Sequence, residues 1–453
     1  MQTIKTINPY TQEPLKTYDV LSDNELIEKI EKADVGFQNW RQTSLESRTE
    51  HLRQLAELLL DRKKEYAKLM AEEMGKPIAQ GIAEIEKCAW VCDFYAKNAS
   101  DFLADQLIET DANESFISYD PLGVILAIMP WNYPFWQVLR FAAPTLMAGN
   151  TVLLKHAANT TQCGLEIEKL LNDAGFPEGC FQTLLVSHEQ IEQVIANDAI
   201  KAVSLTGSEK AGKTIAQLAG KYLKKSVLEL GGNNACIILK DANLDRFIET
   251  MAWARMQNAG QSCIAAKRFI VEESIHDEFV KRFMSILKDY PSGNPLNEST
   301  KIGPMARIDL ADQVENQVLS SLKGGAEILL GNKRDKAYYE PTLVGGVAPG
   351  MPLFDQEVFG PVAAVIKAKN KQKAYSLAQM SKFGLGCMVF TEDIKEARHR
   401  IGSVPDGAFF VNEMVKSDPR LPFGGTKSSG YGRELSKEGI MEFVNKKTVF
   451  IRT

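Results

Sequence analysis

The spacing of hydrophobic residues predicts mainly helices in the first part of the chain. From Ser22 to about residue 105, apolar positions recur at intervals of three and four, as on one face of a helix. Ser22 and Glu25 form a capping-box pattern at the start of the first helix. Gly75 and Pro77 predict a break between two later helices, because neither residue continues a helix easily.

From Gly123 onward, short apolar runs alternate with amphipathic segments. The runs are GVILAIMP (123–130), TVLLK (151–155), CFQTLLVS (180–187), KAVSLTG (201–207) and SVLELGG (226–232). Helical patterns lie between them. This alternation is typical of a parallel sheet covered by helices.

A second alternating region follows residue 263. Its strand-like runs are RFIVEE (268–273), AEILLG (326–331), YEPTLVGG (339–346), PVAAVIKA (361–368), CMVFT (387–391) and GAFFVN (407–412), with helical patterns at 276–290 and 373–380. A chain of 453 residues exceeds what one hydrophobic core usually supports. The sequence therefore predicts two α/β domains.

Composition narrows the class of partner to a small molecule. The formal charge is −5, with no long basic run, which argues against nucleic acid and membrane partners. The first residues lack a signal-peptide pattern and no apolar run is long enough to cross a bilayer, so we expect a cytoplasmic protein. The seven cysteines are scattered, so most should be reduced. Cys88 and Cys92 share one helical face with no histidine nearby, which favours core packing over a metal site.

The run GSEKAGKT, from Gly207 to Thr214, fits the pattern of a phosphate-binding loop. It follows a predicted strand and opens a predicted helix, where free N–H groups attract a phosphate of ATP or of a dinucleotide. Asp241 could hold magnesium if the ligand were ATP. A helix start without any ligand explains the run equally well.

Three polar groups follow strand-like runs in separate loops, where sites of α/β sheets collect. Cys263 lies among small residues, Glu229 ends a predicted strand before paired glycines, and Asn132 follows the run at 123–130 at a predicted helix start. Together they could supply a nucleophile, a base and an amide donor. Each alone also fits a plain structural role: a buried thiol, a surface carboxylate and a helix cap.

Six motifs occur in order along the chain: PWNYP (130–134), SLTGSEKAG (204–212), LELGGNN (228–234), GQSC (260–263), EVFGPV (357–362) and LPFGGTKSSGYGREL (421–435). This combination resembles the NAD(P)-dependent aldehyde dehydrogenase superfamily. The runs GQSCIAAKRFIV and LLKHAANTT are most similar to its succinate-semialdehyde dehydrogenase branch.

The resemblance implies an α/β fold of three parts. These are a Rossmann-like dinucleotide-binding domain (1–105 and 122–230), an α/β catalytic domain (231–430), and a small β extension for oligomerisation (106–121 and 431–453). The terminal run NKKTVFIRT would pair with the sheet of a partner subunit, which implies a homodimer or homotetramer.

The resemblance also assigns roles to residues. Cys263 would be the nucleophile, Glu229 the base, and Asn132 an oxyanion donor. The cofactor residues would be Trp131, Lys155, Ala158, Gly207, Ser208, Gly231, Glu357 and Phe359, with Lys213 turned to solvent. Ala158 stands where relatives often carry a glutamate that holds the ribose diol, so a 2′-phosphate is not repelled and NADP is as acceptable as NAD.

Arg140 is the candidate for substrate selection. Trp136 and Arg140 are four positions apart on one predicted helical face, in the wall that lines the aldehyde tunnel of the resembled family, with Ser417 and Phe423 nearby. A guanidinium there favours a substrate carboxylate, hence succinate semialdehyde, although Arg140 could instead pair with an internal acid. The alternatives are another small aliphatic aldehyde, an ATPase or kinase using Gly207–Thr214, and a binding protein on a retired enzyme fold.

Overall fold

The computed structural model describes residues 2–453, which begin with a β-hairpin and four helices. The hairpin is β1 (Thr3–Ile7) with β2 (Pro14–Asp19), and the helices are α1 (Asp23–Trp40), α2 (Leu45–Asp61), α3 (Lys63–Met74) and α4 (Ile78–Leu103). Ser22 and Glu25 form the predicted capping box of α1. The predicted break is also confirmed: α3 ends at Gly75 with φ of 77°, and a Cβ there would lie 2.8 Å from Pro304. The hairpin was not predicted.

Six strands form the first sheet, in the order β21-β9-β8-β5-β6-β7. They are β5 (Val124–Met129), β6 (Thr151–His156), β7 (Phe181–Thr183), β8 (Ile200–Thr206), β9 (Lys225–Glu229) and β21 (Gly430–Tyr431). Strands β5 to β9 are parallel, as predicted, and β21 pairs with β9 antiparallel. The strand predicted at 180–187 ends at Thr183, because Leu184 and Val186 pack into the core from a loop.

Helices cover both faces of the first sheet, which explains why its strands are continuous apolar runs. Val124 and Leu126 of β5 pack with α1, α7 (Gln190–Ala196) and α8 (Glu209–Lys221). Ile125 and Ala127 point to the other face and pack in one cluster with α2, α4, α5 (Trp136–Met147) and α6 (Thr161–Asp173). Cys88 and Cys92 lie in this second cluster, fully buried, as predicted.

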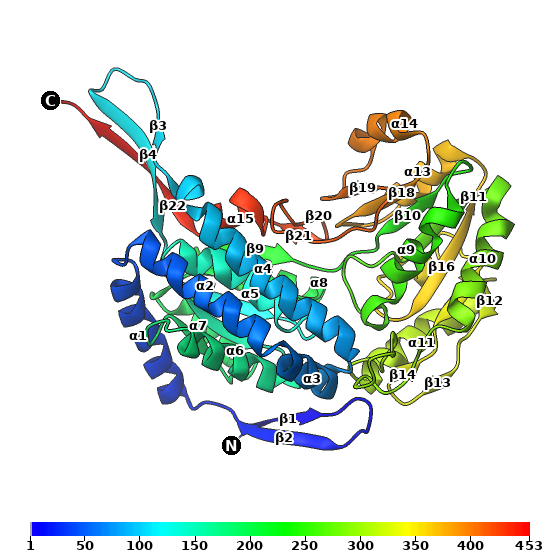
Figure 1. Ribbon diagram of the computed structural model, residues 1–453, viewed down its shortest axis with the longest axis horizontal. Coiled ribbons are helices and arrows are strands. Elements are labelled where there is room, and N and C mark those ends of the chain that lie inside the picture. The colour runs from blue at the N-terminus through cyan, green and yellow to red at the C-terminus, as the bar shows by residue number, and fades with distance from the viewer. Residues whose placement is uncertain (1) are drawn as a thin grey trace.

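Seven strands form the second sheet, in the order β12-β15-β16-β11-β10-β18-β19. They are β10 (Ala235–Ile238), β11 (Arg268–Glu272), β12 (Glu327–Leu330), β15 (Thr342–Gly345), β16 (Val362–Ala368), β18 (Cys387–Phe390) and β19 (Phe409–Val411). The helices of this region are α9 (Leu244–Met256), α10 (His276–Lys288), α11 (Ile308–Lys323), α12 (Pro352–Asp355), α13 (Lys371–Gln379) and α14 (Ile394–His399). Residues of α9 and α10 pack on one face and residues of α11 to α13 on the other. The two sheets lie in two lobes of the molecule (Figure 1).

A three-stranded arm extends from the lobe of the first sheet (Figure 1). It contains β3 (Gln106–Leu107), β4 (Glu114–Pro121) and β22 (Val444–Ile451), and β22 follows α15 (Ser436–Met441). The predicted terminal strand is present and pairs with β4 of its own chain, from Val444 opposite Pro121 to Ile451 opposite Glu114. β22 is an outer strand of the arm, so its other edge pairs with no strand in residues 2–453.

The remaining strands form two small ribbons. They are β13 (Arg334–Asp335) with β14 (Tyr338–Tyr339), and β17 (Phe383–Gly384) with β20 (Thr426–Lys427). None of the helices in residues 2–453 is both long and apolar enough to cross a membrane.

Candidate active site

The loop that carries Cys263 is preceded by a turn with strained backbone and is supported by buried side chains. It follows a short 3₁₀ turn (Gln257–Gly260) in which Asn258 and Ala259 have φ of 54° and 52°. The buried guanidinium of Arg255 donates to the carbonyls of Gly260 (2.8 Å) and Ala266 (3.1 Å), on both sides of the cysteine. Such support is needed because left-handed backbone is unfavourable for residues other than glycine.

The Cys263 carbonyl is fixed by two side chains. It accepts hydrogen bonds from Lys267 Nζ and Asn234 Nδ2, each at 2.7 Å. A Cβ on Gly232 would lie 2.7 Å from the same oxygen, so only glycine allows this approach. Burial raises the pKa of the Cys263 thiol to about 11, while the charges of Arg140 and Lys267 lower it. The thiol is therefore neutral in the resting protein.

Cys263 lies where two cavities meet. The larger, of about 470 Å³, is also lined by Trp131, Asn132, Gln137, Gly207, Ser208, Gly231, Glu357, Phe359 and residues of α11. The smaller, of about 190 Å³, is also lined by Lys87, Trp136, Gln137, Arg140, Met414, Lys416, Ser417 and Phe423. A molecule in either cavity can thus reach the sulfur.

Six of the eight predicted cofactor residues line the larger cavity. Ser208 caps the N-terminus of α8, whose dipole and free N–H groups suit a pyrophosphate. Glu357 Oε1 accepts from the N–H of Gly232 (3.0 Å) and pairs with Lys267 Nζ (3.1 Å), so its carboxylate is held at the wall. A Cβ on Gly231 would collide with Glu357 Oε2. These groups fit the phosphates and a ribose diol of a dinucleotide.

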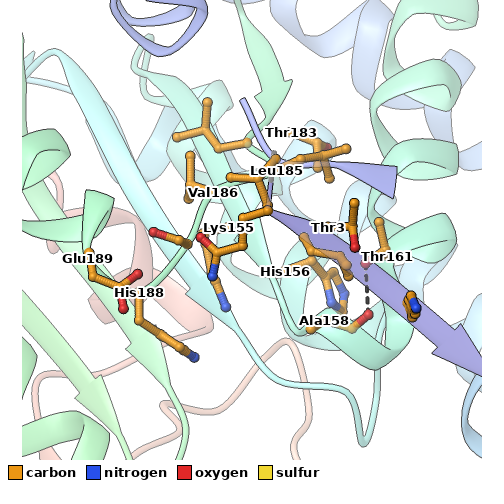
Figure 2. Close-up of a pocket in the computed structure, with 16 residues that line it drawn as sticks. Thr3, Lys155, His156, Ala158, Thr161, Thr183, Leu185, Val186, His188 and Glu189 are labelled. Carbon is orange, nitrogen blue, oxygen red and sulfur yellow. Dashed lines mark hydrogen bonds between the residues drawn. The ribbon is translucent and has the colours of Figure 1, made fainter. Parts of the chain in front are cut away.

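The other two cofactor candidates, Lys155 and Ala158, line a separate cavity of about 280 Å³. Figure 2 shows them beside His156, with Thr3 of β1 and the loop that follows β7 on other sides. No acid in residues 2–453 forms a salt bridge with Lys155, and its burial lowers the pKa of this amine. An anionic ligand group would compensate this charge.

The structure argues against a phosphate-binding loop of the ATPase type at Gly207–Thr214. The helix α8 already begins at Glu209, so most of the run is helical and cannot wrap around a phosphate chain. The Lys213 side chain is 75% exposed and pairs with Glu209, as the resemblance implied. Gly212 allows the helix to approach Leu230, because a Cβ there would lie 2.5 Å from that side chain. Asp241 accepts from Thr391 Oγ1 and two backbone N–H groups instead of facing this helix start.

Asn132 reaches the cavity from a loop rather than from a helix. The helix α5 begins four residues later, at Trp136, because Glu84 Oε1 accepts from the N–H groups of Phe135 and Trp136. Asn132 Nδ2 donates to the carbonyl of Gln261 (3.2 Å), which places the amide beside the cysteine loop. The amide and Cys263 therefore line the same space, as the oxyanion hypothesis requires.

Glu229 ends β9 as predicted, but its carboxyl group is withdrawn from both cavities. The side chain is buried, and a Cβ on Gly424 would lie 2.7 Å from its Oε1. Neither carboxyl oxygen has a hydrogen-bond partner among the described residues. Burial raises the pKa of Glu229 well above its usual range, and the nearby Glu434 raises it further.

The four predicted substrate residues, Trp136, Arg140, Ser417 and Phe423, all line the smaller cavity. Arg140, however, has an internal partner. Its Nε pairs with the buried Glu434, its Nη2 donates to Thr206 Oγ1 (3.3 Å), and its face lies on the ring of Phe423 at 4.8 Å. Arg140 therefore pairs with an internal acid, as in the alternative stated for it, and its contact with a substrate stays a prediction.

Sequence reasoning missed Lys87. This residue lies on α4 with Gln80, Ala83 and Glu84, which line the same cavity at helical spacing. Polar residues at that spacing normally form a solvated helix face, so nothing in the sequence marked Lys87 as a residue that lines a cavity. Glu434 was also missed, although it lies inside the quoted motif at 421–435. Residues 2–453 contain no group of three or more side chains arranged to bind a metal ion.

Comparison with known proteins gives the family. The model of the aldehyde dehydrogenase family matches residues 1–449. The chain belongs to the aldehyde dehydrogenase family. It is 48% identical over 451 residues to a Synechocystis protein named as a probable NADP(+) succinate-semialdehyde dehydrogenase, with 99% of each chain covered. It is 44% identical over 454 residues to the NADP(+) succinate-semialdehyde dehydrogenase 1 of Mycobacterium bovis, with 99% of each chain covered.

A solved structure shows the same fold. The succinic semialdehyde dehydrogenase from Streptococcus pyogenes, in complex with NADP+, superposes with a TM-score of 0.97 at 36% identity, covering 99% of this chain and 100% of that one. The predicted fold class and family are confirmed. As an aldehyde dehydrogenase, the protein oxidises an aldehyde with NAD or NADP as the acceptor.

Proposed function

We propose that this aldehyde dehydrogenase oxidises succinate semialdehyde to succinate, with Cys263 as the nucleophile. The observation that carries the proposal is the position of Cys263 between the two cavities, the smaller of which contains the cationic side chains of Lys87 and Arg140. Cationic groups beside a cavity favour an aldehyde that also carries a carboxylate. The names of the relatives from Synechocystis and M. bovis support the same substrate.

The first bond forms between Cys263 sulfur and the aldehyde carbon, and the thiol loses its proton as the sulfur attacks. The carbonyl oxygen becomes an alkoxide, which we assign to the amide of Asn132 and the N–H of Cys263, because both residues line the same cavity. A bound nicotinamide would supply the hydride acceptor, and loss of hydride from the substrate carbon would leave a thioester on Cys263. Water then cleaves the carbon–sulfur bond. In total, one aldehyde, one oxidised cofactor and one water give one carboxylic acid, one reduced cofactor and one proton.

Glu229 is our candidate for the base that activates this water. It ends β9 close enough for its charge to affect the Cys263 thiol. Its carboxyl group has no hydrogen bond to break among the residues described, so turning toward the thioester costs little. Because its pKa is raised, the group holds its proton more tightly than an ordinary carboxyl and would pass it to a neighbour, for which Glu434 is closely placed.

We propose that the first lobe is the dinucleotide-binding domain, the second the catalytic domain and the arm the oligomerisation extension. The cofactor would extend from Glu357 past Ser208 toward Lys155 and Ala158. The amine of Lys155, which pairs with no acid among residues 2–453, and the small side chain of Ala158 support acceptance of a 2′-phosphate. A homodimer or homotetramer would cover the outer edge of β22, where Phe450 and Ile451 are exposed. A cytoplasmic location stays a prediction.

A substrate panel tests the function. Purified protein is assayed for reduced nicotinamide with succinate semialdehyde, butanal and other small aldehydes, each with NAD and with NADP, in the absence of magnesium. We expect a higher kcat/KM for succinate semialdehyde than for butanal, and no activity in Cys263→Ala. A preference for butanal would reject the proposed substrate, and an active Cys263→Ala variant would reject the mechanism.

A further inference from the structure

The smaller cavity contains a cation with no acidic partner, and this cation is Lys87 rather than Arg140. Lys87 Nζ donates to Ser417 Oγ (2.7 Å) and lies 4.2 Å from the centroid of the Trp136 ring. Lys87 forms no salt bridge with any acid in residues 2–453. An ammonium group has three hydrogens to donate, so two remain.

The two acids nearest to Lys87 are committed elsewhere. Glu84 pairs with the buried Lys76 and accepts from two N–H groups at the start of α5. Asp418 accepts from Arg420 Nε (2.9 Å) and Nη2 (2.7 Å), and also from the N–H of Arg420. Neither carboxylate is therefore free to neutralise the ammonium group.

Ser417 adds a second donor beside Lys87. Its oxygen accepts from Lys87 Nζ and from Trp136 Nε1 (3.1 Å), which uses both lone pairs. The hydroxyl proton must then be donated to another group, and the structure shows no hydrogen bond donated by Ser417 Oγ to any of residues 2–453. A buried hydroxyl without an acceptor is unfavourable unless a ligand supplies one.

We propose that Lys87 and Ser417 together bind the carboxylate of the substrate and thereby determine specificity, while Arg140 serves the interior. One carboxylate oxygen accepts from the ammonium group and the other from the Ser417 hydroxyl, which uses both free donors. The aldehyde end then lies toward Cys263, which lines the same cavity. This assignment depends on the proposed function, since it names the residues that recognise the acid end of that substrate.

The ionisation of Lys87 supports this geometry and gives a test without mutation. Burial, and after it the positive charge of Arg140, lower the pKa of Lys87 to about 8. The charged or titratable groups that face it are Arg140 of α5, Glu84 and Cys88 of α4, and Asp418 of the loop after β19. As the pH rises through about 8 the ammonium group loses its proton, so the preference for an anionic aldehyde should decline.

The experiment measures the ratio of kcat/KM for succinate semialdehyde to that for butanal, in which ionisations common to both substrates cancel. Lys87→Met should lower this ratio by about 10- to 100-fold, as expected for the loss of one charge-assisted hydrogen bond, mainly through KM. Lys416→Met is the matched control, because Lys416 lines the same cavity but is exposed and paired with Glu413. It should change the ratio by less than about twofold.

Lys87→Arg should recover part of the preference, and Ser417→Ala should lower it by about 5- to 10-fold because a neutral donor is lost. In the unmodified enzyme the ratio should fall by about tenfold per pH unit above pH 8. An unchanged ratio in Lys87→Met, or an equal fall in Lys416→Met, would overturn the assignment. If Lys87→Met does not fold, a constant ratio from about pH 7 to 9.5 in the unmodified enzyme overturns it. The proposed substrate itself fails if the unmodified enzyme shows no preference at neutral pH.

Discussion

Replacing Arg140 by methionine should cost stability rather than substrate selection. The guanidinium is 2% exposed and pairs with Glu434, which is 4% exposed. Glu434 also lies close enough to Glu229 to raise the pKa of Glu229. Among residues 2–453, Arg140 is the only cation that forms an ion pair with Glu434. Its removal therefore leaves an unpaired carboxylate in the interior. Breaking such a buried pair typically costs ~3–5 kcal/mol, or about two to four orders of magnitude in the unfolding equilibrium.

The assay is urea unfolding followed by tryptophan fluorescence at one fixed protein concentration, so that subunit association contributes equally to every variant. Arg140→Met with Glu434→Leu should recover most of the loss, because an apolar pair can replace a buried ion pair at little cost. Arg420→Met is the control: Arg420 is 67% exposed, and its pair with Asp418 should contribute less than about 1 kcal/mol. A single variant within about 1 kcal/mol of the unmodified protein, or a double variant no more stable than the single, would refute the reasoning.

Glu229→Gln should still give a burst of reduced nicotinamide in stopped-flow measurements but should turn over slowly; normal turnover would mean that another group is the base. Ala158→Glu should lower kcat/KM for NADP by about tenfold or more and leave kcat/KM for NAD within about threefold. The reason is that Ala158 is exposed at the cavity of Lys155, where a carboxylate repels the 2′-phosphate. Equal loss with both cofactors would contradict this. The rate of Cys263 alkylation without cofactor can be measured by peptide mass spectrometry. It should rise about tenfold per pH unit up to about pH 10, because the pKa of the Cys263 thiol is about 11. A plateau of the rate below pH 8 would contradict that value. Lys213→Ala should leave the dehydrogenase rate within about twofold, because this side chain points to solvent, and a large loss would revive the phosphate-loop interpretation.

Periodicity predicted the order of elements well because both large sheets bury their strands on two faces. Apolar runs such as 151–155 and 361–368 became β6 and β16 with nearly the expected bounds. The same reasoning overextended β7, since an apolar run is equally required of a loop that packs against a core. It missed the hairpin β1–β2, whose residues are mostly exposed and carry no strong alternation.

Candidate site residues at strand ends could be located from sequence, but their partners could not. The ends of the parallel strands β5 and β9 place Asn132 and Glu229 at the same edge of the first sheet whatever their side chains contact. Pairing across more than two hundred residues has no local signature, so the partner of Arg140, Glu434, remained hidden. The shift of the α5 start from Asn132 to Trp136 has the same origin, because Glu84 of another helix caps it.

The two cations of the smaller cavity illustrate why one charge in a tunnel wall is weak evidence for a charged substrate. Helical spacing placed Trp136 and Arg140 correctly on one wall, yet the Arg140 charge compensates Glu434 inside the protein. Without that compensation the two buried carboxyl groups of Glu229 and Glu434 would be unfavourable, so the guanidinium is needed whether or not the substrate is an anion. The charge free to select a substrate is the one whose nearest acids are already paired. On that criterion the specificity of the cavity depends on Lys87, which contributes a donor to Ser417 and retains two more.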